Sequence, residues 1–510
     1  MSKGLKNNHF FGTIELVKME VMEMNFISGE NRNQITLMPD SVEDYIDDNN
    51  SVRVIEAYIN SLNLAELDFA RSQPRETGRP MYDPKDLLKL YLYGYMNKVR
   101  SSRRLETETK RNLEVIWLLR KLSPDHKTIA RFRRDNTVAL KNVFRNFVKL
   151  CVEMNLYGKE LIAIDGSKFK AVNSKDRNFT RKKLQDRIAR IDAKIEEYLL
   201  ELEDSDWQDA ATDGEKSTEE IAEIIAELAE RKDRYQSYAD ELAQTGDTQK
   251  SLTDPDSRLM ISNGKKDICY NIQTAVDAKN KLIVEFDVTN NATDNNQITP
   301  MVEISKAALE AEKLTVVVDA GYDSVQDIVT CIKLGNDIHV ASTDFDICMP
   351  SNEQSEITTH KDGRPVYYAD SNTVLCPMGN SLHPEHYKKS GFGVFYNSAA
   401  CKQCTHKCST EKRGRRYQVP MRKADFSKNY NEKDLFVKQI RITPDKDIVR
   451  KRKSIVEHPF GTIKRNMDAG YCLTRGLKSV NGEFSLTFLA YNFKRAINIL
   501  GAKKLIENIV

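Results

Sequence analysis

The sequence predicts a mixed α/β protein in which helices cover a sheet, preceded by a helical and basic N-terminal region. From Leu161 to residue 341, short apolar runs rich in Val and Ile alternate with helix-like segments. Before residue 155, apolar residues recur at three- and four-residue steps, which is typical of amphipathic helices. A chain of 510 residues with 40% hydrophobic content is long enough for two or three domains.

The N-terminal helices begin at recognisable signals. Val52, Ile55, Ile59 and Leu62 mark one helix, and Asp83-Pro84 opens a second. Ser123-Pro124-Asp125 resembles an N-cap followed by a first-turn proline, so another helix is expected to start there. A further helix is expected from near Thr137. We therefore assign residues 1–155 to an α-helical domain.

The charge of this domain is concentrated. Residues 100–149 hold 14 Lys and Arg against 5 Asp and Glu, although the whole chain has a net charge of only +3. A compact basic region attracts a phosphate backbone, because each contact releases condensed counterions. A solvated basic helix face is the alternative. Arg131, Arg133 and Arg134 are our candidates for DNA contact in this region.

The sheet is predicted from residue 158 onwards. LIAIDGSKFKAV predicts a β-hairpin in which Asp165 ends the first strand and Gly166 begins the turn. Further strands are expected to end near Ala278, Val288, Asp319 and Ala341, with helices over residues 300–311 and 324–334. The body of the domain is expected to span residues 158–500.

Two inserts interrupt this body. Residues 192–247 hold 5 Lys and Arg against 19 Asp and Glu, and apolar residues there keep heptad-compatible spacing. We expect an acidic helical hairpin over residues 180–247. The second insert, residues 343–443, is rich in polar residues and is expected to consist mostly of loops.

Carboxylates at the ends of buried strands are candidate metal ligands. Asp165 follows the run LIAI and Asp319 follows LTVVV, and burying a carboxylate is costly unless it is paired or bound to metal. Glu457 is a third candidate, because it is a lone acid in the basic helix RKRKSIVEHPFGTIKRN. Lys453 and Lys464 are expected on its side of the helix, ready to meet phosphate together with Arg452. Pro459 is expected to break or kink this helix.

A cysteine cluster lies in the second insert. The chain has nine cysteines and neither a secretory signal nor an apolar span, so we expect reduced thiols in the cytoplasm. Four of these cysteines have spacings that could close a tetrahedral zinc site, with His383, His386 and His406 as possible substitutes. The cluster consists of Cys376, Cys401, Cys404 and Cys408.

Several long motifs, in order along most of the chain, resemble the DDE transposases of insertion sequences, in particular the insertion sequence eleven-eighty-two family. They are TGRPMYDPKDLLKLYLYGY, SPDHKTIARFRRDN, AIDGSKFKAVNSKDRNFT, TDPDSRLM, YNIQTAVDAKNKLIV, VTNNATDNNQ, VVVDAGYDS and KSIVEHPFGTIKR. The resemblance implies a ribonuclease-H-like catalytic core with Asp165, Asp319 and Glu457 as its acids. In the pattern around the third acid, Lys453 and Lys464 match the basic positions and Arg450 replaces a tyrosine.

What the resemblance implies about function is specific. Two Mg²⁺ or Mn²⁺ ions would serve cleavage at terminal inverted repeats and transfer of the freed 3′-hydroxyl to target DNA. A homodimer on DNA and a nucleoid-associated, cytoplasmic location are expected. Three alternatives remain open: a metal-dependent nuclease of the same fold, a catalytically inactive DNA-binding protein derived from a transposase, and a zinc-ribbon adaptor.

Overall fold

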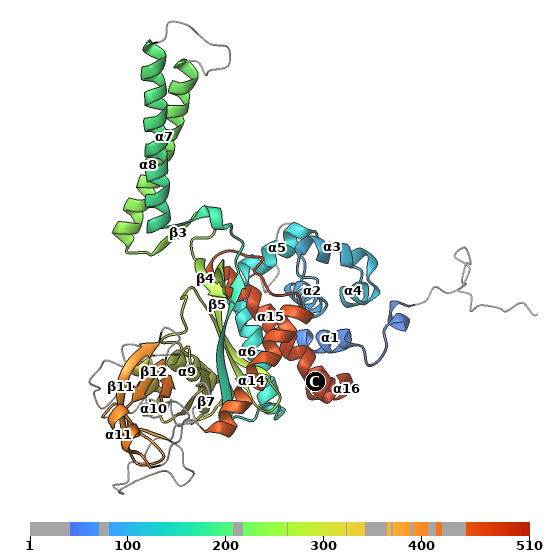
Figure 1. The fold of residues 1–510 in the computed structure, drawn as a ribbon. Helices are drawn as coiled ribbons and strands as arrows, with labels where there is room; N and C mark the ends of the chain where they lie inside the picture. Colours follow the sequence, from blue (N-terminus) through green and yellow to red (C-terminus); the bar gives the residue numbers. More distant parts are fainter. Residues whose placement is uncertain are drawn as a thin grey trace, which may run out of the picture. The chain divides into compact units, whose positions relative to one another are not determined.

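The computed structural model describes residues 41–70, 81–207, 218–262, 264–322, 324–341, 365–368, 371–388, 392–405, 415–420 and 445–509. Residues Ile46–Val510 form one compact unit, and Met1–Tyr45 form another, of which the described part is the short helix η1 (Val42–Tyr45). Helices and strands of the larger unit are coloured along the chain in Figure 1.

Among the described residues of the larger unit, six helices precede the sheet, and side-chain caps start several of them. Asp83 caps α2 ahead of Pro84, and Asp125 caps α5 by accepting hydrogen bonds from the backbone of Lys127 and Thr128. Helix α5 therefore begins two residues later than predicted, because Asp125 supplies the cap. The bounds are α1 Ser51–Ser61, α2 Pro84–Met96, α3 Ser102–Arg111, α4 Leu113–Leu118, α5 His126–Asp135 and α6 Thr137–Glu153.

A six-stranded mixed sheet forms the centre of the unit. Its order is β4-β5-β1-β7-β8, and β6 also pairs with β5. Strand β1 is antiparallel to β5 and parallel to β7, which is parallel to β8. The prediction that Asp319 ends a strand is confirmed, since β7 ends there. The bounds are β1 Leu161–Lys170, β4 Arg258–Ser262, β5 Lys265–Asp277, β6 Ile283–Thr289, β7 Thr315–Asp319 and β8 Asp337–Ala341.

The hairpin predicted at Gly166 is wrong. Strand β1 runs without a turn from Leu161 to Lys170 and pairs along its length with β5, with Gly166 opposite Gln273. Asp165 therefore lies within a strand and not at its end. Position 166 has no room for a side chain, because a Cβ there would come within 2.4 Å of Asp294 Oδ1.

Helix α14 (Lys446–Gly461) contacts β1, β7 and β8 and so covers the sheet next to the two aspartates. Pro459 lies inside it without ending it, and a π-helical turn, Thr462–Asn466, follows. The helix is therefore not broken at Pro459, and the change to a wider turn comes three residues after it. Helices α9 (Ile298–Leu309) and α10 (Val325–Lys333) pack against each other, and α9 also contacts β5 and β6.

Helix α15 (Leu477–Leu500) joins the N-terminal helices to the sheet. It is buried on nearly all sides and contacts α2, α6 and β6, and the short helix α16 (Ala502–Ile509) follows it. The fully buried Asn492 hydrogen-bonds both the N–H and the C=O of Ile283, which satisfies backbone groups of β6. Helices and sheet thus share one hydrophobic core instead of forming two separate ones.

A buried ion pair ties the same regions together. Arg100 Nη2 lies 2.6 Å from Glu483 Oε1, and the two side chains are 4% and 0% exposed. Arg100 also donates to the carbonyl oxygens of Asp468 and Tyr471. Glu483 accepts further hydrogen bonds from the backbone of Leu473 and Thr474 and from the Thr474 hydroxyl.

The acidic segment contains two long helices, α7 (Arg181–Trp207) and α8 (Thr218–Thr245), that pack side by side (Figure 1). Strands β2 (Asn178–Thr180) and β3 (Gln249–Ser251) pair at their base. Phe179, Leu184 and Leu242 form a small core there. The helices thus lie where the sequence predicted a hairpin.

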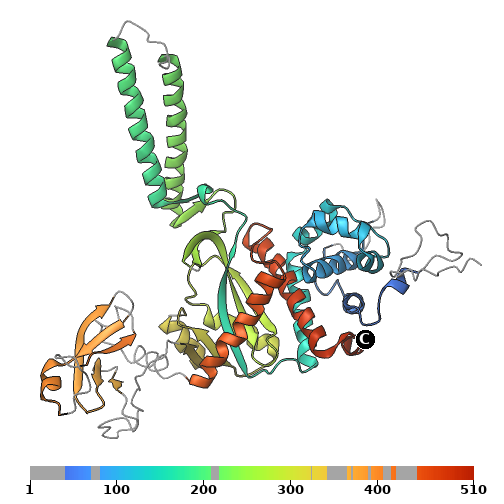
Figure 2. The ribbon, with the colours of Figure 1, turned by 45° about the vertical axis from the view of Figure 1, so that its right-hand side comes forward.

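The second insert is more ordered than a set of loops. Its described residues form a five-stranded antiparallel sheet with the short helix α11 (Ser398–Gln403), shown in orange in Figure 2. Tyr367, Leu382 and Phe395 are buried in its core. The sequence did not predict these strands. The bounds are β9 Val366–Tyr368, β10 Thr373–Leu375, β11 Ser381–Lys388, β12 Phe392–Tyr396 and β13 Tyr417–Pro420. Within the described part of the chain, no helix is both long and apolar enough to span a bilayer.

Candidate active site

Asp165 and Asp319 come together on neighbouring parallel strands. In the register of β1 and β7, Leu161 lies opposite Thr315 and Ala163 opposite Val317. Two residues further along each strand, Asp165 and Asp319 are level, and the period of two places their side chains on the same face. The apolar runs before each acid bury both strands in the core. The structure thus brings two of the three predicted acids together.

One cation lies between these carboxylates. Arg452 Nη2 is 3.3 Å from Asp319 Oδ1, and Arg452 Nη1 is 3.9 Å from Asp165 Oδ2. Only 17% of the Arg452 side chain is exposed, so this arginine faces the sheet and not open solvent. Sequence reasoning placed Arg452 on DNA and missed this position.

The helical pattern contained the signal for it. Ile448, Val449, Ile455 and Val456 stand four and three residues before Arg452 and three and four residues after it, and all four pack against the core. Residues at these offsets share a helix face. Arg452 is therefore at the centre of the packed face of α14, where a buried cation needs a partner of opposite charge.

The electrostatics of the pair favour a bound cation. Burial raises the pKa of Asp165 to about 6, with Arg452 opposing this effect and Asp319 and Asp294 adding to it. Like charges in a partly dry site repel each other, so an added positive charge stabilises the ionised pair. Carboxylate oxygens are also the donors that Mg²⁺ and Mn²⁺ prefer. The donor set of Asp165 and Asp319 thus fits a hard divalent cation.

Glu457 is not brought to this pair. Its carboxylate lies 3.8 Å from Lys453 Nζ on the same helix, and 64% of its side chain is exposed. It follows Arg452 by five residues, which corresponds to a rotation of roughly 140° around the helix. Among the described residues, no three His, Cys, Asp or Glu side chains converge as a metal site.

The two lysines predicted beside Glu457 differ. Lys453 is 76% exposed. Lys464 instead packs on β1, where its Nζ donates to Ser167 Oγ at 2.5 Å and lies 4.5 Å from the centre of the Phe169 ring. Burial lowers the pKa of Lys464, with Asp165 acting in the opposite direction. This amine is thus next to the strand that carries the first acid.

The three candidate arginines of the N-terminal region differ in exposure and in their contacts. Arg131 and Arg134 are exposed, and Arg134 pairs with Asp135. Arg133 is partly buried, donates to the Tyr95 hydroxyl at 3.0 Å and lies over the Tyr91 ring. Its guanidinium thus has partners within the helical region.

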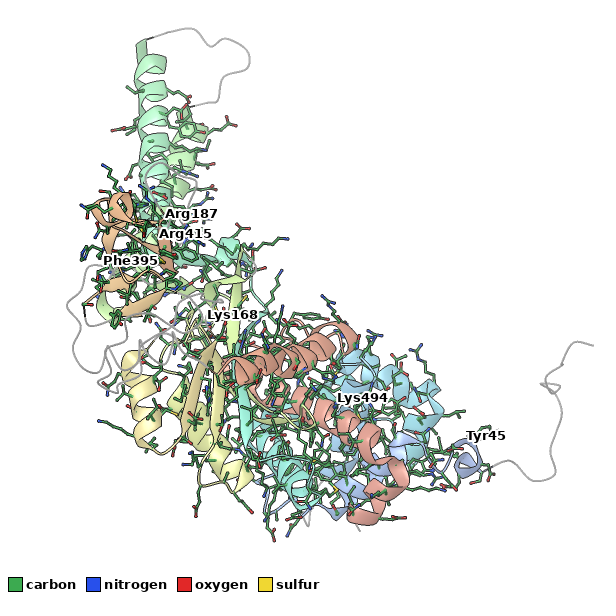
Figure 3. The ribbon with its side chains drawn as sticks, turned by 60° about the horizontal axis from the view of Figure 1, so that its bottom comes forward. Tyr45, Lys168, Arg187, Phe395, Arg415 and Lys494 are labelled. Carbon is green, nitrogen blue, oxygen red and sulfur yellow. The ribbon has the colours of Figure 1, made fainter. Side chains whose placement is uncertain are left out.

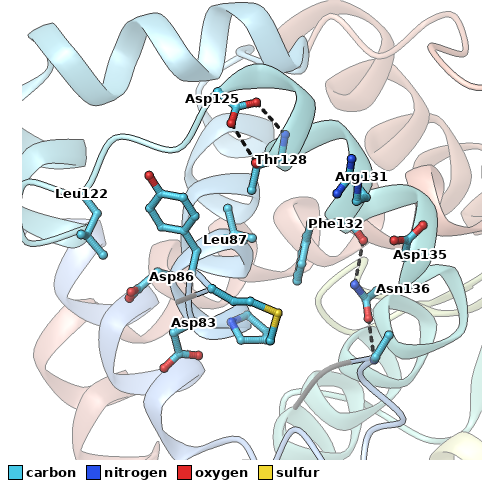
Figure 4. A pocket seen from close by; sticks show the side chains of 14 residues that line it. Asp83, Asp86, Leu87, Leu122, Asp125, Thr128, Arg131, Phe132, Asp135 and Asn136 are labelled. Atoms are coloured by element: carbon cyan, nitrogen blue, oxygen red, sulfur yellow. Dashed lines mark hydrogen bonds between the residues drawn. The ribbon is translucent and has the colours of Figure 1, made fainter. Parts of the chain in front are cut away.

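A pocket of about 750 Å³ lies between α2 and α5, with Arg131 on its wall (Figure 4). Its lining also includes four aspartates, two of which cap helices. This excess of negative charge does not suit a phosphate group. The four are Asp83, Asp86, Asp125 and Asp135.

The cysteine cluster is described in part. Cys376 is buried in the core of the small sheet, and Cys401 packs against that core. Cys404 follows α11 and is half-buried. Cys408 and His406 lie outside the described residues, so the fourth position of the predicted zinc site is not placed.

Residues 40–135 match a family model described as a transposase domain (DUF772), and residues 375–497 match one described as a transposase DDE domain. No curated protein matches the chain. A cryo-EM structure of the piggyBac transposase synaptic complex with hairpin DNA is similar at 10% identity and a TM-score of 0.29, over 90% of this chain and 79% of that one. Two separate segments of the chain thus match transposase domains, and together they support a transposase.

Proposed function

We propose that this chain is a DDE transposase that binds the terminal inverted repeats of its element, cleaves DNA there and transfers the 3′-end to target DNA. The observation that carries the proposal is the pair Asp165 and Asp319, level on parallel strands and sharing one cation. The strand order, with three antiparallel strands followed by two parallel ones, supports a ribonuclease-H-like core. The two family matches point the same way.

Asp165 and Asp319 would hold Mg²⁺ or Mn²⁺, with Glu457 as the third acid by its place in the family motif. Bound divalent ions of this kind make water a stronger nucleophile and stabilise the leaving oxygen. The protein's own part is to hold the two aspartates level and to offset their charge with Arg452 until a metal ion binds. Lys453, exposed beside Glu457, is suited to contact DNA phosphate.

The DNA surface would include Arg131 and Arg134, which are exposed in the basic N-terminal region. Binding two element ends would be served by a homodimer. Structural zinc at the cysteine cluster belongs to the same proposal, because Cys376, Cys401 and Cys404 lie in or beside one small sheet.

The test uses the full chain with DNA that carries the element's ends, in the presence of Mg²⁺. We expect nicks at the 3′-ends and joined products, both abolished by Asp165→Asn and by Asp319→Asn while DNA binding persists. Glu303→Gln, which changes an exposed carboxylate in α9, is the control and keeps both activities.

Other results of this experiment would contradict the proposed site or favour one of the alternatives. Strand transfer by either aspartate variant would overturn the site. Nicking without joined products would favour a nuclease, and DNA binding without cleavage in either Mg²⁺ or Mn²⁺ would favour an inactive DNA-binding protein.

A further inference from the structure

Asp294 lies in the loop between β6 and α9, within the motif VTNNATDNNQ. One of its oxygens, Oδ1, accepts three hydrogen bonds: from Lys168 Nζ at 3.0 Å, Asn271 Nδ2 at 2.8 Å and Gln273 Nε2 at 2.7 Å. Lys168 belongs to β1 and the two amides belong to β5 (Lys168 is labelled in Figure 3). A single carboxylate oxygen thus binds both strands to the loop.

The alternation of side chains places Asp294 behind the two aspartates. Gly166 and Lys168 lie opposite Gln273 and Asn271, so these four share one face of the sheet. Asp165, one residue before Gly166, points to the other face. Asp294 therefore reaches the reverse side of β1 at the residue next to the first acid.

Gly166, directly after the first acid, leaves room for Asp294, and Gly321 lies near the same carboxylate. A Cβ on Gly166 would lie 2.4 Å from Asp294 Oδ1, which is closer than real Cβ contacts allow. A Cβ on Gly321, two residues after Asp319, would lie 3.9 Å from Asp294 Oδ2. The carboxylate thus packs against β1 beside the first acid and lies near the turn that follows the second.

A buried polar network continues from Asp294 towards the second acid. The Tyr322 hydroxyl, on a side chain that is 1% exposed, donates to Gln273 Oε1. Tyr322 follows Asp319 by three residues, and its N–H donates to the Asp319 carbonyl. Each acid is thus connected to Asp294 by a short chain of contacts.

The network is maintained at a cost to stability. Asn271 is fully buried, and its Nδ2 donates to Asp294 and to the Asn291 carbonyl, which fixes the orientation of the amide. Its Oδ1 then has no hydrogen-bond partner, although a buried acceptor without a partner destabilises a fold. A buried polar network that lowers the stability of the fold is better explained by a role in positioning neighbouring residues.

We propose that Asp294 is a positioning residue for the two-aspartate site. From the reverse face of the sheet it packs against β1 at Gly166 and, through Gln273 and Tyr322, is linked to the backbone after Asp319, and so keeps Asp165 and Asp319 level. This inference rests on the proposed function, in which the two aspartates hold a divalent cation.

The experiment measures Mn²⁺ binding by the DNA-free full chain, from the electron paramagnetic resonance signal of free Mn²⁺. Wild-type protein is expected to bind Mn²⁺, and Asp165→Asn to lose this binding. Asp294→Ala should bind about 10- to 100-fold more weakly, the range found for groups that orient metal ligands. Asp294→Asn keeps an oxygen for the three donors and should retain most of the wild-type affinity. Glu303→Ala, on the exposed face of α9, is the control and should match wild type.

Thermal unfolding of each variant separates positioning from stability. A lower unfolding temperature of Asp294→Ala with wild-type Mn²⁺ affinity would show a merely structural role and overturn the inference. Should Asp294→Ala not fold, Gly166→Ala decides, because its methyl group would lie 2.4 Å from both Asp294 Oδ1 and Gln273 Nε2 and so disrupts the hydrogen bond between them; wild-type affinity there would also refute the role. Absence of Asp165-dependent Mn²⁺ binding in wild type would count against the proposed function itself.

Discussion

Replacing Arg100 with methionine removes one half of the buried pair with Glu483 and should destabilise the fold strongly. The Arg100 side chain is 4% exposed, so its loss leaves an ionised carboxylate in the core. Breaking a buried ion pair in this way costs about 3–5 kcal/mol. We expect the destabilisation by Arg100→Met to lie at the lower end of this range, because Glu483 keeps its hydrogen bonds from Leu473 and Thr474.

Glu483→Gln should cost at least as much. One Glu483 oxygen accepts from Arg100 and Leu473, and the other accepts from Leu473 and Thr474. An amide group must place its NH₂ at one of these positions, where it meets a donor in either orientation. The variant therefore loses the negative charge, and its NH₂ group also faces two hydrogen-bond donors that it cannot accept from.

The assay is urea unfolding followed by far-ultraviolet circular dichroism, with the slope of free energy against urea checked for constancy. The double variant should lose less than the sum of the single losses, by about 0.5–3 kcal/mol, since neither charge then remains unpaired. Lys110→Met, at an exposed helical pair with Glu106, is the matched control and should change stability by less than about 1 kcal/mol. Single losses below about 1 kcal/mol, or strictly additive losses, would refute the reasoning.

Three further predictions concern metal ions and pH. Arg452→Met should bind Mn²⁺ more tightly in the DNA-free titration, because no guanidinium has to be displaced from the aspartates; weaker binding would contradict this competition. Burial lowers the pKa of Lys141 to about 8 from its ordinary 10.5, so charged Lys141 penalises the folded state at low pH. This penalty disappears as the pH rises from 8 to 10.5, so the stability of wild type relative to Lys141→Met should increase across that window and stay level below it. The cysteine cluster should hold about one zinc per purified chain, lost in Cys401→Ser; elemental analysis below about a tenth of an equivalent would argue against the site.

Local patterns predicted much of the fold. Strand β8 occupies the predicted residues, and α6 begins at Thr137 as expected and buries Phe144 and Phe147. These elements have an uninterrupted apolar run or a clear helical period, so their own residues determine them.

The remaining features depend on residues distant in the sequence. A glycine between Asp165 and a polar stretch resembles a turn, but the strand continues because it pairs with β5. The missing side chain at 166 is explained by Asp294 and Gln273, both more than a hundred residues later. The apolar residues around Arg452 place it on the packed face of α14. Its pairing with the aspartates could be inferred only once the part of the sheet that α14 contacts was known. Glu457 was chosen from the motif, and its side-chain direction follows from how α14 packs, which no motif specifies.

The burial of α15 has a consequence for synthesis on the ribosome. Arg100 and Glu483 are 383 residues apart, and the groove between α2 and α6 is filled by a helix translated near the end. At roughly 5–20 residues per second, the first helices wait roughly 20–80 s for that partner. During this interval their apolar faces are exposed or are covered by chaperones. A product that ends before residue 477 therefore lacks the part of the shared core that α15 supplies, and the faces of α2 and α6 that α15 covers stay exposed.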